Sequence, residues 1–264
     1  MNGRMKPAVG RLLNDARFSF APSGGEDVLR QGLIMLALYA VYDVSRAVVV
    51  GREATAMANG LFFLNLEKAM HIYVEPWVQS HISSIPGAMG FMVWAYGALH
   101  LPLIMGAMVW VFTQRRSQWK LIRNWFLGIN FLAVLMYFLL PTAPPRMIFT
   151  SGIVDMSYMY GKRPAILENG FLANPFAAMP SLHFAYALFI ALVVFMLARQ
   201  RWLRWGGFLY PALVLVVIVA TGNHFIVDAL GSVLVVATAW ALAVSLQPGD
   251  ARELQTVSVR ERDG

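Results

Sequence analysis

Long apolar stretches alternate with shorter polar segments along most of the chain. A helix needs about 20 mainly apolar residues to cross the roughly 30 Å hydrocarbon core of a membrane. Six stretches have this character and are expected to be membrane-spanning helices: 29–50, 86–112, 121–141, 181–198, 206–222 and 224–246. The pattern therefore predicts an all-α, polytopic membrane protein with six transmembrane helices.

The remaining segments are too polar to span a membrane. Residues 1–28 are basic and contain no apolar signal-peptide core, so we expect a cytoplasmic N-terminal segment and an uncleaved first helix. The segment between the first two predicted spans should form amphipathic helices at the membrane surface. Residues 247–264 are expected to be a disordered cytoplasmic tail. Residues 29–246 would then form a single membrane catalytic domain, with its polar motifs in 141–232.

Composition strengthens this prediction. Hydrophobic residues make up 58% of the chain and charged residues 13%, whereas soluble domains carry about 25% charged residues. The chain has no cysteine, which excludes disulfides and thiolate metal sites. Its net charge of +7 indicates basic loops beside anionic membrane lipids, and nucleic acid is not an expected partner.

Lysine and arginine are distributed unevenly between the two sets of segments that six helices would separate. With the N-terminus in the cytosol, fourteen of the 21 lie on the inner side and five on the outer side. Cytoplasmic loops of membrane proteins carry such an excess of positive charge. We therefore expect a multi-pass cell-membrane protein with both termini in the cytosol.

In this orientation, polar side chains from separate segments meet at the extracytoplasmic face. Arg146 follows the third predicted helix in "LLPTAPPR", and Ser181 and His183 begin the fourth in "NPFAAMPSLH". The sixth begins with His224, and Asp228 lies four residues further on, on the same helical face. Residues distant in sequence are thus expected to form one site.

These residue types suit phosphoryl transfer. Asp228 can accept the proton of one His224 nitrogen, which leaves the other nitrogen as a nucleophile. His183, from another helix, can protonate the leaving group. Arg146, Ser181 and the start of the fourth helix can bind phosphate oxygens. The set predicts transfer through a phosphohistidine, and no metal ion or other cofactor is expected.

The two histidine motifs resemble those of the type 2 phosphatidic acid phosphatase superfamily. Pro180-Ser181-Leu182-His183 is similar to its P-S-G-H motif, and His224-Phe225-Ile226-Val227-Asp228 matches its H-x3-D motif. The resemblance covers residues 120–246. It implies that His224 is the nucleophile, Asp228 its partner and His183 the general acid. The substrate would be a phospholipid or another lipid phosphate, bound among membrane lipids.

The sequence departs from the phosphatases of this superfamily at three points. Leu182 replaces the glycine of P-S-G-H. The K-x6-R-P motif is absent, because Leu139 stands at its lysine position and Met147 at its proline position, on either side of Arg146. Ile218 stands where the third motif carries an arginine. The stretches "PTAPPR" and "NPFAAMPSLH" are closer to the inositol phosphorylceramide synthase branch, which transfers a phosphorylated head group to a hydroxyl acceptor. We therefore favour a phosphotransferase, with a lipid phosphate phosphatase as the alternative.

Other polar residues have less specific interpretations. Lys162 and Arg163, in the same outer loop as Arg146, either touch substrate or contact solvent and lipid head groups. Asp43 and Arg46 are expected to form an ion pair in the first span. A non-catalytic lipid or ion transporter is a remote alternative to an enzyme. A vanadate-dependent haloperoxidase is more remote still, because those enzymes are soluble.

Three further residues attract attention through their spacing. Glu67, His71 and Glu75 are four residues apart and would share one face of a helix. Exposed charge on an interfacial helix is the favoured interpretation, and a metal site is the minor one. His100 lies in the second predicted span, where it would bond to a neighbouring helix or line a substrate cavity. The oligomeric state is not predicted.

Overall fold

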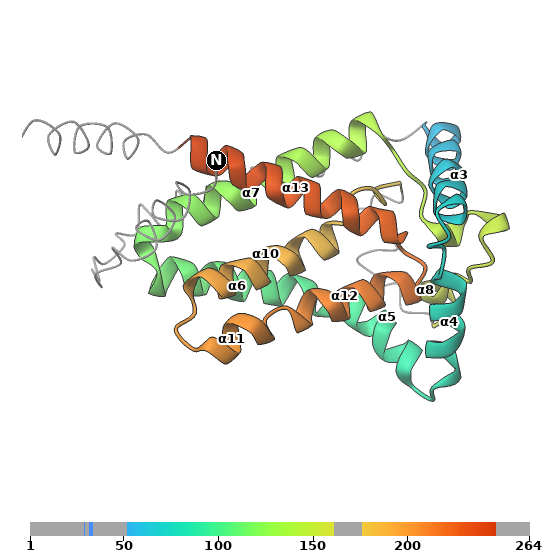
Figure 1. Cartoon of the computed structure of the whole chain (residues 1–264), viewed down its shortest axis with the longest axis horizontal. Helices are drawn as coiled ribbons and strands as arrows, with labels where there is room; N and C mark the ends of the chain where they lie inside the picture. Colours follow the sequence, from blue (N-terminus) through green and yellow to red (C-terminus); the bar gives the residue numbers. More distant parts are fainter. Residues whose placement is uncertain (1–28, 30–31, 34–51, 161–175, 247–264) are drawn as a thin grey trace, which may run out of the picture.

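The computed structural model describes residues 29, 32–33, 52–160 and 176–246, and the regular structure within these ranges is helical (Figure 1). The predicted all-α architecture is therefore confirmed for the described chain. The helices are α3 (Glu53–Ala69), α4 (Glu75–Ser84), α5 (Ala88–Ala98), α6 (His100–Gln114), α7 (Trp119–Leu139), α8 (Met156–Met159), α10 (Leu182–Leu197), α11 (Arg201–Gly206), α12 (Leu209–Ala220) and α13 (Ile226–Ser245).

The described helices support three or four membrane spans by length and composition, rather than six. Three segments are long and apolar enough: 116–139, which includes α7, 201–220, which joins α11 and α12, and α13. Helices α5 and α6 qualify together as a span bent by 47°. The first predicted span, 29–50, lies almost entirely outside the described residues.

Helix α10 corresponds to the fourth predicted span, 181–198, and agrees with it to one residue at each end. Helix α10 has 16 residues, which corresponds to about 24 Å at 1.5 Å per residue. It starts only at Leu182 because the Ser181 side chain accepts a hydrogen bond from the Phe184 N–H as an N-cap. It ends before Ala198, whose backbone is extended. The helix is therefore shorter than the roughly 30 Å hydrocarbon core of a membrane.

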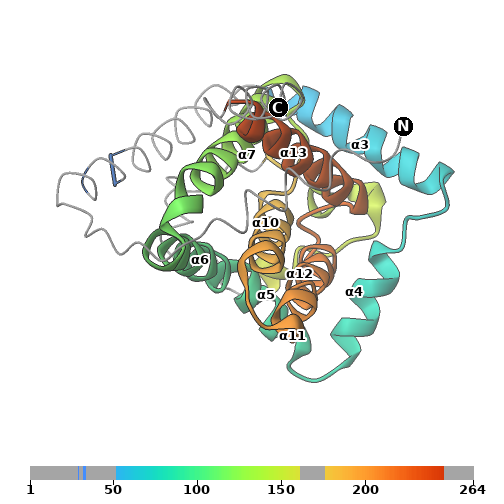
Figure 2. The same cartoon turned by 60° about the vertical axis from the view of Figure 1, so that its left-hand side comes forward.

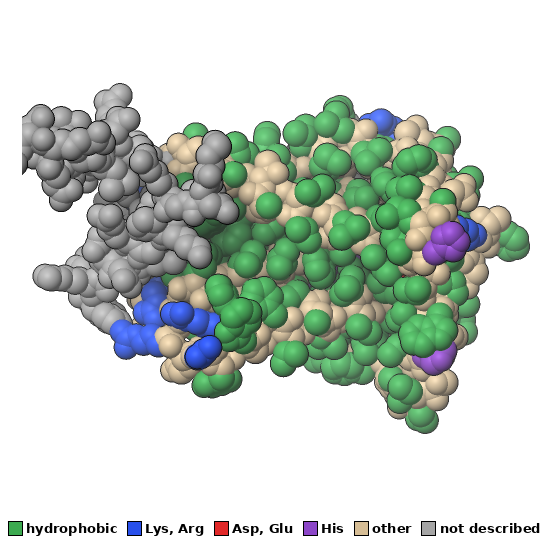
Figure 3. Space-filling model, in the orientation of Figure 1, with side chains coloured by type: hydrophobic (Ala, Val, Ile, Leu, Met, Phe, Trp, Pro, Cys, Tyr) green, Lys and Arg blue, Asp and Glu red, His purple; other side chains and the backbone are tan. Residues whose placement is uncertain are grey.

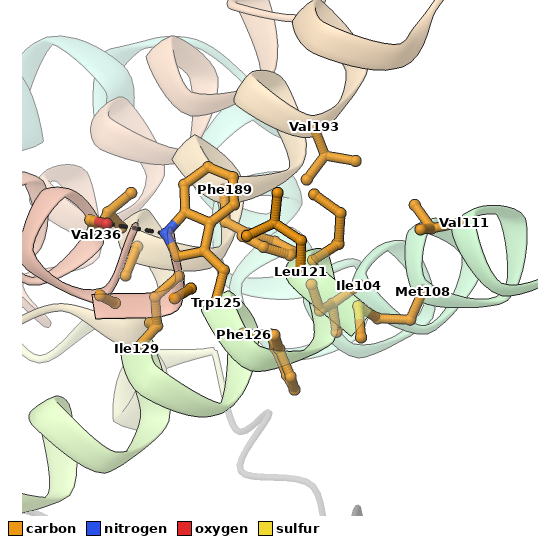
Figure 4. Close-up of a cluster of buried hydrophobic side chains, with 14 of the residues drawn as sticks. Ile104, Met108, Val111, Leu121, Trp125, Phe126, Ile129, Phe189, Val193 and Val236 are labelled. Carbon is orange, nitrogen blue, oxygen red and sulfur yellow. Dashed lines mark hydrogen bonds between the residues drawn. The ribbon is translucent and has the colours of Figure 1, made fainter. Parts of the chain in front are cut away.

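Helix α10 is the central helix of the bundle. It packs against α6, α7, α12 and α13, which surround it when the bundle is viewed from near one end (Figure 2). Trp125 of α7 occupies the middle of the core, edge-on to Phe189 of α10 and to Trp240 of α13. Its indole N–H donates to the Val236 carbonyl at 2.9 Å (Figure 4). This bond satisfies the polar atom of an otherwise apolar core.

Helices α3 and α4 lie across the end of the bundle where α7 and α12 finish and α10 and α13 begin (Figure 1). Both expose large apolar side chains, including Phe62 and Trp77, as expected for interfacial helices. Their opposite faces carry buried polar side chains, Glu67, Glu75 and Gln79, which contact the bundle. We call this end of the molecule the covered end.

Positive charge gathers at the other end of the bundle, where Figure 3 shows most of the visible lysine and arginine side chains. The residues belong to the α6–α7 and α10–α11 connections and the first turns that follow them: Arg115, Arg116, Lys120, Arg123, Arg199, Arg201 and Arg204. The two ends of the bundle therefore differ sharply in charge.

Candidate functional site

The two histidines singled out in the sequence lie together at the covered end. His183 is in the first turn of α10, and His224 is in the turn between α12 and α13. Their ring centroids are 6.1 Å apart, with an angle of 54° between the ring planes. Tyr96 of α5 stacks on His183 at 4.0 Å and lies 6.5 Å from the His224 ring. The structure thus brings together two imidazoles from separate segments, one in α10 and one in the turn before α13.

His224 is held by two acceptors through the same ring nitrogen. Its Nδ1 lies 2.9 Å from the Ala178 carbonyl and 3.3 Å from Asp228 Oδ2. A ring nitrogen facing two oxygen acceptors carries the proton, which leaves Nε2 with its lone pair. The predicted contact with Asp228 is present, but the backbone carbonyl is the nearer partner. The sequence does not disclose this contact because any residue could supply the carbonyl.

Asp228 also organises the start of α13. It is fully buried, and its Oδ2 accepts the Phe225 N–H at 2.9 Å, directly before the first turn of α13. The Asp228 carbonyl accepts from the Ser181 N–H and from the Ser232 hydroxyl. The same hydroxyl lies 2.8 Å from the Ser181 carbonyl. These contacts connect the starts of α10 and α13, the two segments that supply the histidines.

Ser181 has a structural role in these contacts. Its hydroxyl caps α10, and the residue is fully buried. His183, two residues on, is only partly buried, and the Tyr96 backbone is the hydrogen-bond partner of its ring. The His183 ring is thus fixed by α5, which the sequence analysis assigned no role. Tyr96 and His100 are four residues apart and both contact His183, a spacing that was visible in the sequence.

Arg146 reaches the turn that carries His224. It lies in a short 3₁₀ turn, Pro145–Met147, and its backbone N–H donates to the Gly222 carbonyl at 3.1 Å. Its guanidinium donates to the Asn223 side chain, and its Nε lies 3.3 Å from Asp155 Oδ2. Asn223 and Asp155 were not identified from the sequence, although Asn223 directly precedes His224. Arg146 therefore connects the Pro145–Met147 turn to the turn that carries His224.

Gly222 allows this turn to form. Its φ is 73°, a conformation that favours glycine, and an added Cβ would lie 2.5 Å from Ile153 Cγ2. The Asn223 side chain bonds to the Thr221 hydroxyl at 2.7 Å. Thr221, Gly222 and Asn223 thus form the turn after α12 that directly precedes His224.

His100 lines a small cavity behind His183. The cavity has a volume of about 20 Å³, and its walls are formed mainly by apolar side chains of α5 and α12. His100 lies between His183 and Tyr186, with ring centroids at 4.6 Å and 5.0 Å. Among the described residues, His100 Nε2 and the Tyr210 hydroxyl have no hydrogen-bond partner. This cavity is far too small for a lipid phosphate, so neither of the two roles considered for His100 is decided.

Glu67, His71 and Glu75 do not share a helical face, so the interpretation as an exposed charged helix was wrong. Helix α3 ends at Ala69, and His71 takes a positive φ of 59° that reverses the chain before α4. His71 is exposed, whereas both glutamates are completely buried. No group of His, Asp and Glu side chains within the described ranges is arranged to hold a metal ion.

The other residues named from the sequence lie outside the described residues. Lys162 and Arg163 fall in 161–175, and Asp43 and Arg46 fall in 34–51. Their predicted roles stay predictions.

The bundle of apolar helices fits a membrane protein, and its histidine pair fits a phosphoryl-transfer site. Residues 61–242, more than half of the chain, match the PAP2 (type 2 phosphatidic acid phosphatase) superfamily, and the protein belongs to that superfamily. Membership indicates a phosphatase or phosphotransferase of lipid phosphates. No curated protein and no solved structure shows significant similarity to the chain.

Proposed function

We propose that the protein is an integral-membrane phosphotransferase that moves a phosphoryl or phospho-head group from a lipid phosphate to a hydroxyl acceptor through a phosphohistidine. The observation that carries this proposal is the pairing of His183 and His224, with rings 6.1 Å apart. His224 Nδ1 is engaged by Ala178 and Asp228, so its Nε2 is the available nucleophile.

The first half-reaction forms a bond between phosphorus and His224 Nε2. The bond from phosphorus to the lipid oxygen breaks, and protonated His183 gives its proton to that oxygen. Asp228 and the Ala178 carbonyl stabilise the positive charge that develops on the His224 ring. Arg146, held by Asn223 and Asp155, binds the phosphate oxygens as negative charge spreads over them.

The second half-reaction restores the enzyme. His183, now neutral, takes the proton of the acceptor hydroxyl, and the acceptor oxygen attacks the phosphorus of phospho-His224. The bond between phosphorus and nitrogen breaks, and both histidines return to their starting states. Arg146 and the start of α10 supply the positive electrostatic potential at each step, so the mechanism requires no metal ion. A water acceptor would make the enzyme a phosphatase.

Two positions favour a transferase over a phosphatase. Ile218, where the phosphatases carry an arginine, is fully buried and packs with Ala187 and Val214. Leu139, where they carry a lysine, is largely exposed at the end of α7. Neither side chain can bind phosphate. This supports a head-group transfer similar to that of the inositol phosphorylceramide synthase branch, with a phospholipid as donor.

The distribution of charge supports an extracytoplasmic active site. The histidine pair lies at the covered end, and most described lysines and arginines cluster at the opposite end. Positive loops face the cytosol in membrane proteins. The covered end, with α3 and α4, would therefore face outward, and both termini would be cytoplasmic.

The decisive experiment incubates the purified protein with phospholipids carrying labelled phosphate, with and without added polyols, and analyses all products. Label recovered in a new phosphodiester or phosphomonoester of the polyol is the expected result. Free phosphate as the sole product would establish the phosphatase alternative. Absence of turnover by wild type, together with lipid flux in vesicles that is insensitive to His224→Ala, would refute an enzyme of either kind.

A further inference from the structure

Two glutamates are completely buried at the covered end, one on each of the helices that cross it. Glu67 lies in the last turn of α3, and Glu75 begins α4. Both residues have a relative exposure of 0%. Glutamate is almost never fully buried unless its charge is neutralised or paired, because burial removes the hydration of the carboxylate. No part of the phosphoryl-transfer mechanism uses either side chain.

Both glutamates bind the start of α13. Glu75 Oε1 accepts the Ile226 N–H at 3.1 Å, and Glu67 Oε1 accepts the Val227 N–H at 2.8 Å. The first N–H groups of a helix have no partner within the helix, and negative charge is favoured there. Together with the Asp228 bond to Phe225, these contacts give three consecutive N–H groups a carboxyl acceptor each. The first of them directly follows His224.

The two carboxyl groups are neighbours, because they accept adjacent N–H groups of α13 and Glu75 acts electrostatically on Glu67. A hydrogen bond between neighbouring carboxyl groups requires a proton on one of them. Oε2 of each glutamate is buried and has no hydrogen-bond partner among the described residues. Within the described ranges, the ionisable groups that face Glu67 are Glu75 on α4, Tyr73 in the α3–α4 connection and Asp228 on α13. None of them is basic, so a proton is what neutralises the pair.

We propose that Glu67 and Glu75 are positioning residues: they form a buried carboxyl pair that shares one proton and fastens the first turn of α13, and so hold His224 and Asp228 in place. The proposal rests on the proposed function for its effect on catalysis, but its structural part is independent of the reaction. Helices α3 and α4 thereby serve the site through hydrogen bonds to α13 as well as by covering it.

The electrostatics of the pair agree with this arrangement. Burial, followed by the hydrogen bond to Glu75 and its charge, raises the pKa of Glu67 to about 9. Burial and the charge of Glu75 also raise the pKa of the Tyr73 hydroxyl. The pair therefore holds one proton at neutral pH and loses it in alkaline solution. Two adjacent buried carboxylates would then repel each other, and the hydrogen bond between them would be lost.

The test compares Glu67→Gln with the wild type across pH 6.5–10.5. A glutamine amide at residue 67 accepts the Val227 N–H and donates to Glu75 at every pH, so it reproduces the protonated pair permanently. At pH 10 about one tenth of a group with a pKa near 9 stays protonated, so wild-type kcat should fall about tenfold relative to the variant. Each rate is normalised to the same protein at pH 7.5. This normalisation cancels alkaline losses that both proteins share.

Unfolding provides a second readout that needs no substrate. The folded-state pKa of Glu67 is raised from 4.5, so its proton stabilises the fold fully below pH 4.5, and this contribution is lost as pH rises towards 9. The unfolding temperature of the wild type in detergent should therefore fall more between pH 6.5 and 10 than that of Glu67→Gln. Glu53→Gln, an exposed position on the same helix, is the matched control and should follow the wild type in both readouts.

A disruptive variant tests the positioning role. Glu67→Ala leaves the Val227 N–H without its acceptor and should lower kcat about 10- to 100-fold with a smaller change in KM. If Glu67→Ala does not fold, the comparison of Glu67→Gln with the wild type still tests the proposal. Wild type and Glu67→Gln with parallel pH profiles in rate and unfolding would overturn the proposal. Absence of phosphoryl transfer by wild type would instead overturn the proposed function, while the unfolding comparison would still test the carboxyl pair.

Discussion

His183, in the first turn of α10, and His224, just before α13, have ring centroids 6.1 Å apart at one end of the bundle. In the proposed mechanism, this separation spans the reacting phosphorus, with His224 as the nucleophile and His183 as the acid. It depends on hydrogen bonds that join the starts of α10 and α13 through Ser181, Asp228 and Ser232. The site is therefore built into the packing of the bundle.

Substitution of the two histidines should separate their roles. His224→Gln removes the nucleophile and should abolish both turnover and the covalent adduct. His183→Gln should slow turnover about 10²- to 10⁴-fold, the usual contribution of a general acid, yet still permit slow labelling of His224. Acid-labile, alkali-stable label on the protein after rapid quenching measures the adduct. Equal labelling of His224→Gln and wild type would contradict the phosphohistidine mechanism.

Asp228→Asn should lower kcat less than the loss of a carboxylate that orients a catalytic histidine usually does. The Ala178 carbonyl, at 2.9 Å, still holds His224 Nδ1–H and maintains the tautomer. We expect kcat to fall about 10- to 100-fold, as for other groups that orient a histidine. A fall of about 10⁴-fold, as seen when the tautomer is lost, would contradict the role assigned to the carbonyl.

Arg146→Lys should weaken substrate binding. Lysine keeps the charge but cannot reproduce the planar fork that contacts Asn223 and Asp155 while binding phosphate. We expect KM for the lipid phosphate to rise about tenfold, the equivalent of one charge-assisted hydrogen bond. Arg201→Lys, an exposed change at the opposite end, is the control. Similar kinetics for the two variants would show that Arg146 does not bind substrate.

Gly222→Ala should distort the turn before His224. The positive φ costs about 1–3 kcal/mol for a residue with a Cβ, and the new methyl would collide with Ile153. Thermal unfolding in detergent should show the loss of stability, with a matching loss of kcat. Gly106→Ala, in α6 with open space around it, should leave both unchanged or raise stability slightly. A stable and active Gly222→Ala protein would refute this account of the turn.

The proposed orientation can be tested by labelling single cysteines, because the natural chain has none. Tyr158→Cys is exposed near the covered end, and Trp202→Cys is exposed at the positively charged end. A membrane-impermeant maleimide added to intact cells should label the first variant and not the second. Labelling of the second alone would invert the topology and place the site in the cytosol.

The amino-acid sequence by itself determined the helical class and the superfamily, and it predicted that His183 and His224 lie together. Apolar runs dictate helices in a membrane because the backbone must satisfy its own hydrogen bonds there. The match over residues 61–242 confirms the superfamily that the His183 and His224 motifs indicated. The start of α10 was also predicted to within one residue, at the Ser181 cap.

Only the tertiary structure decided what surrounds those residues. The Ala178 carbonyl and the Tyr96 ring reach the histidines through backbone position and helix packing, neither of which leaves a motif in the sequence. The spacing of Glu67 and Glu75 suggested one exposed helical face, but the chain reverses at His71 and buries both side chains against α13. Local sequence determines which segments are helical, whereas burial and hydrogen-bond partners depend on contacts between distant residues.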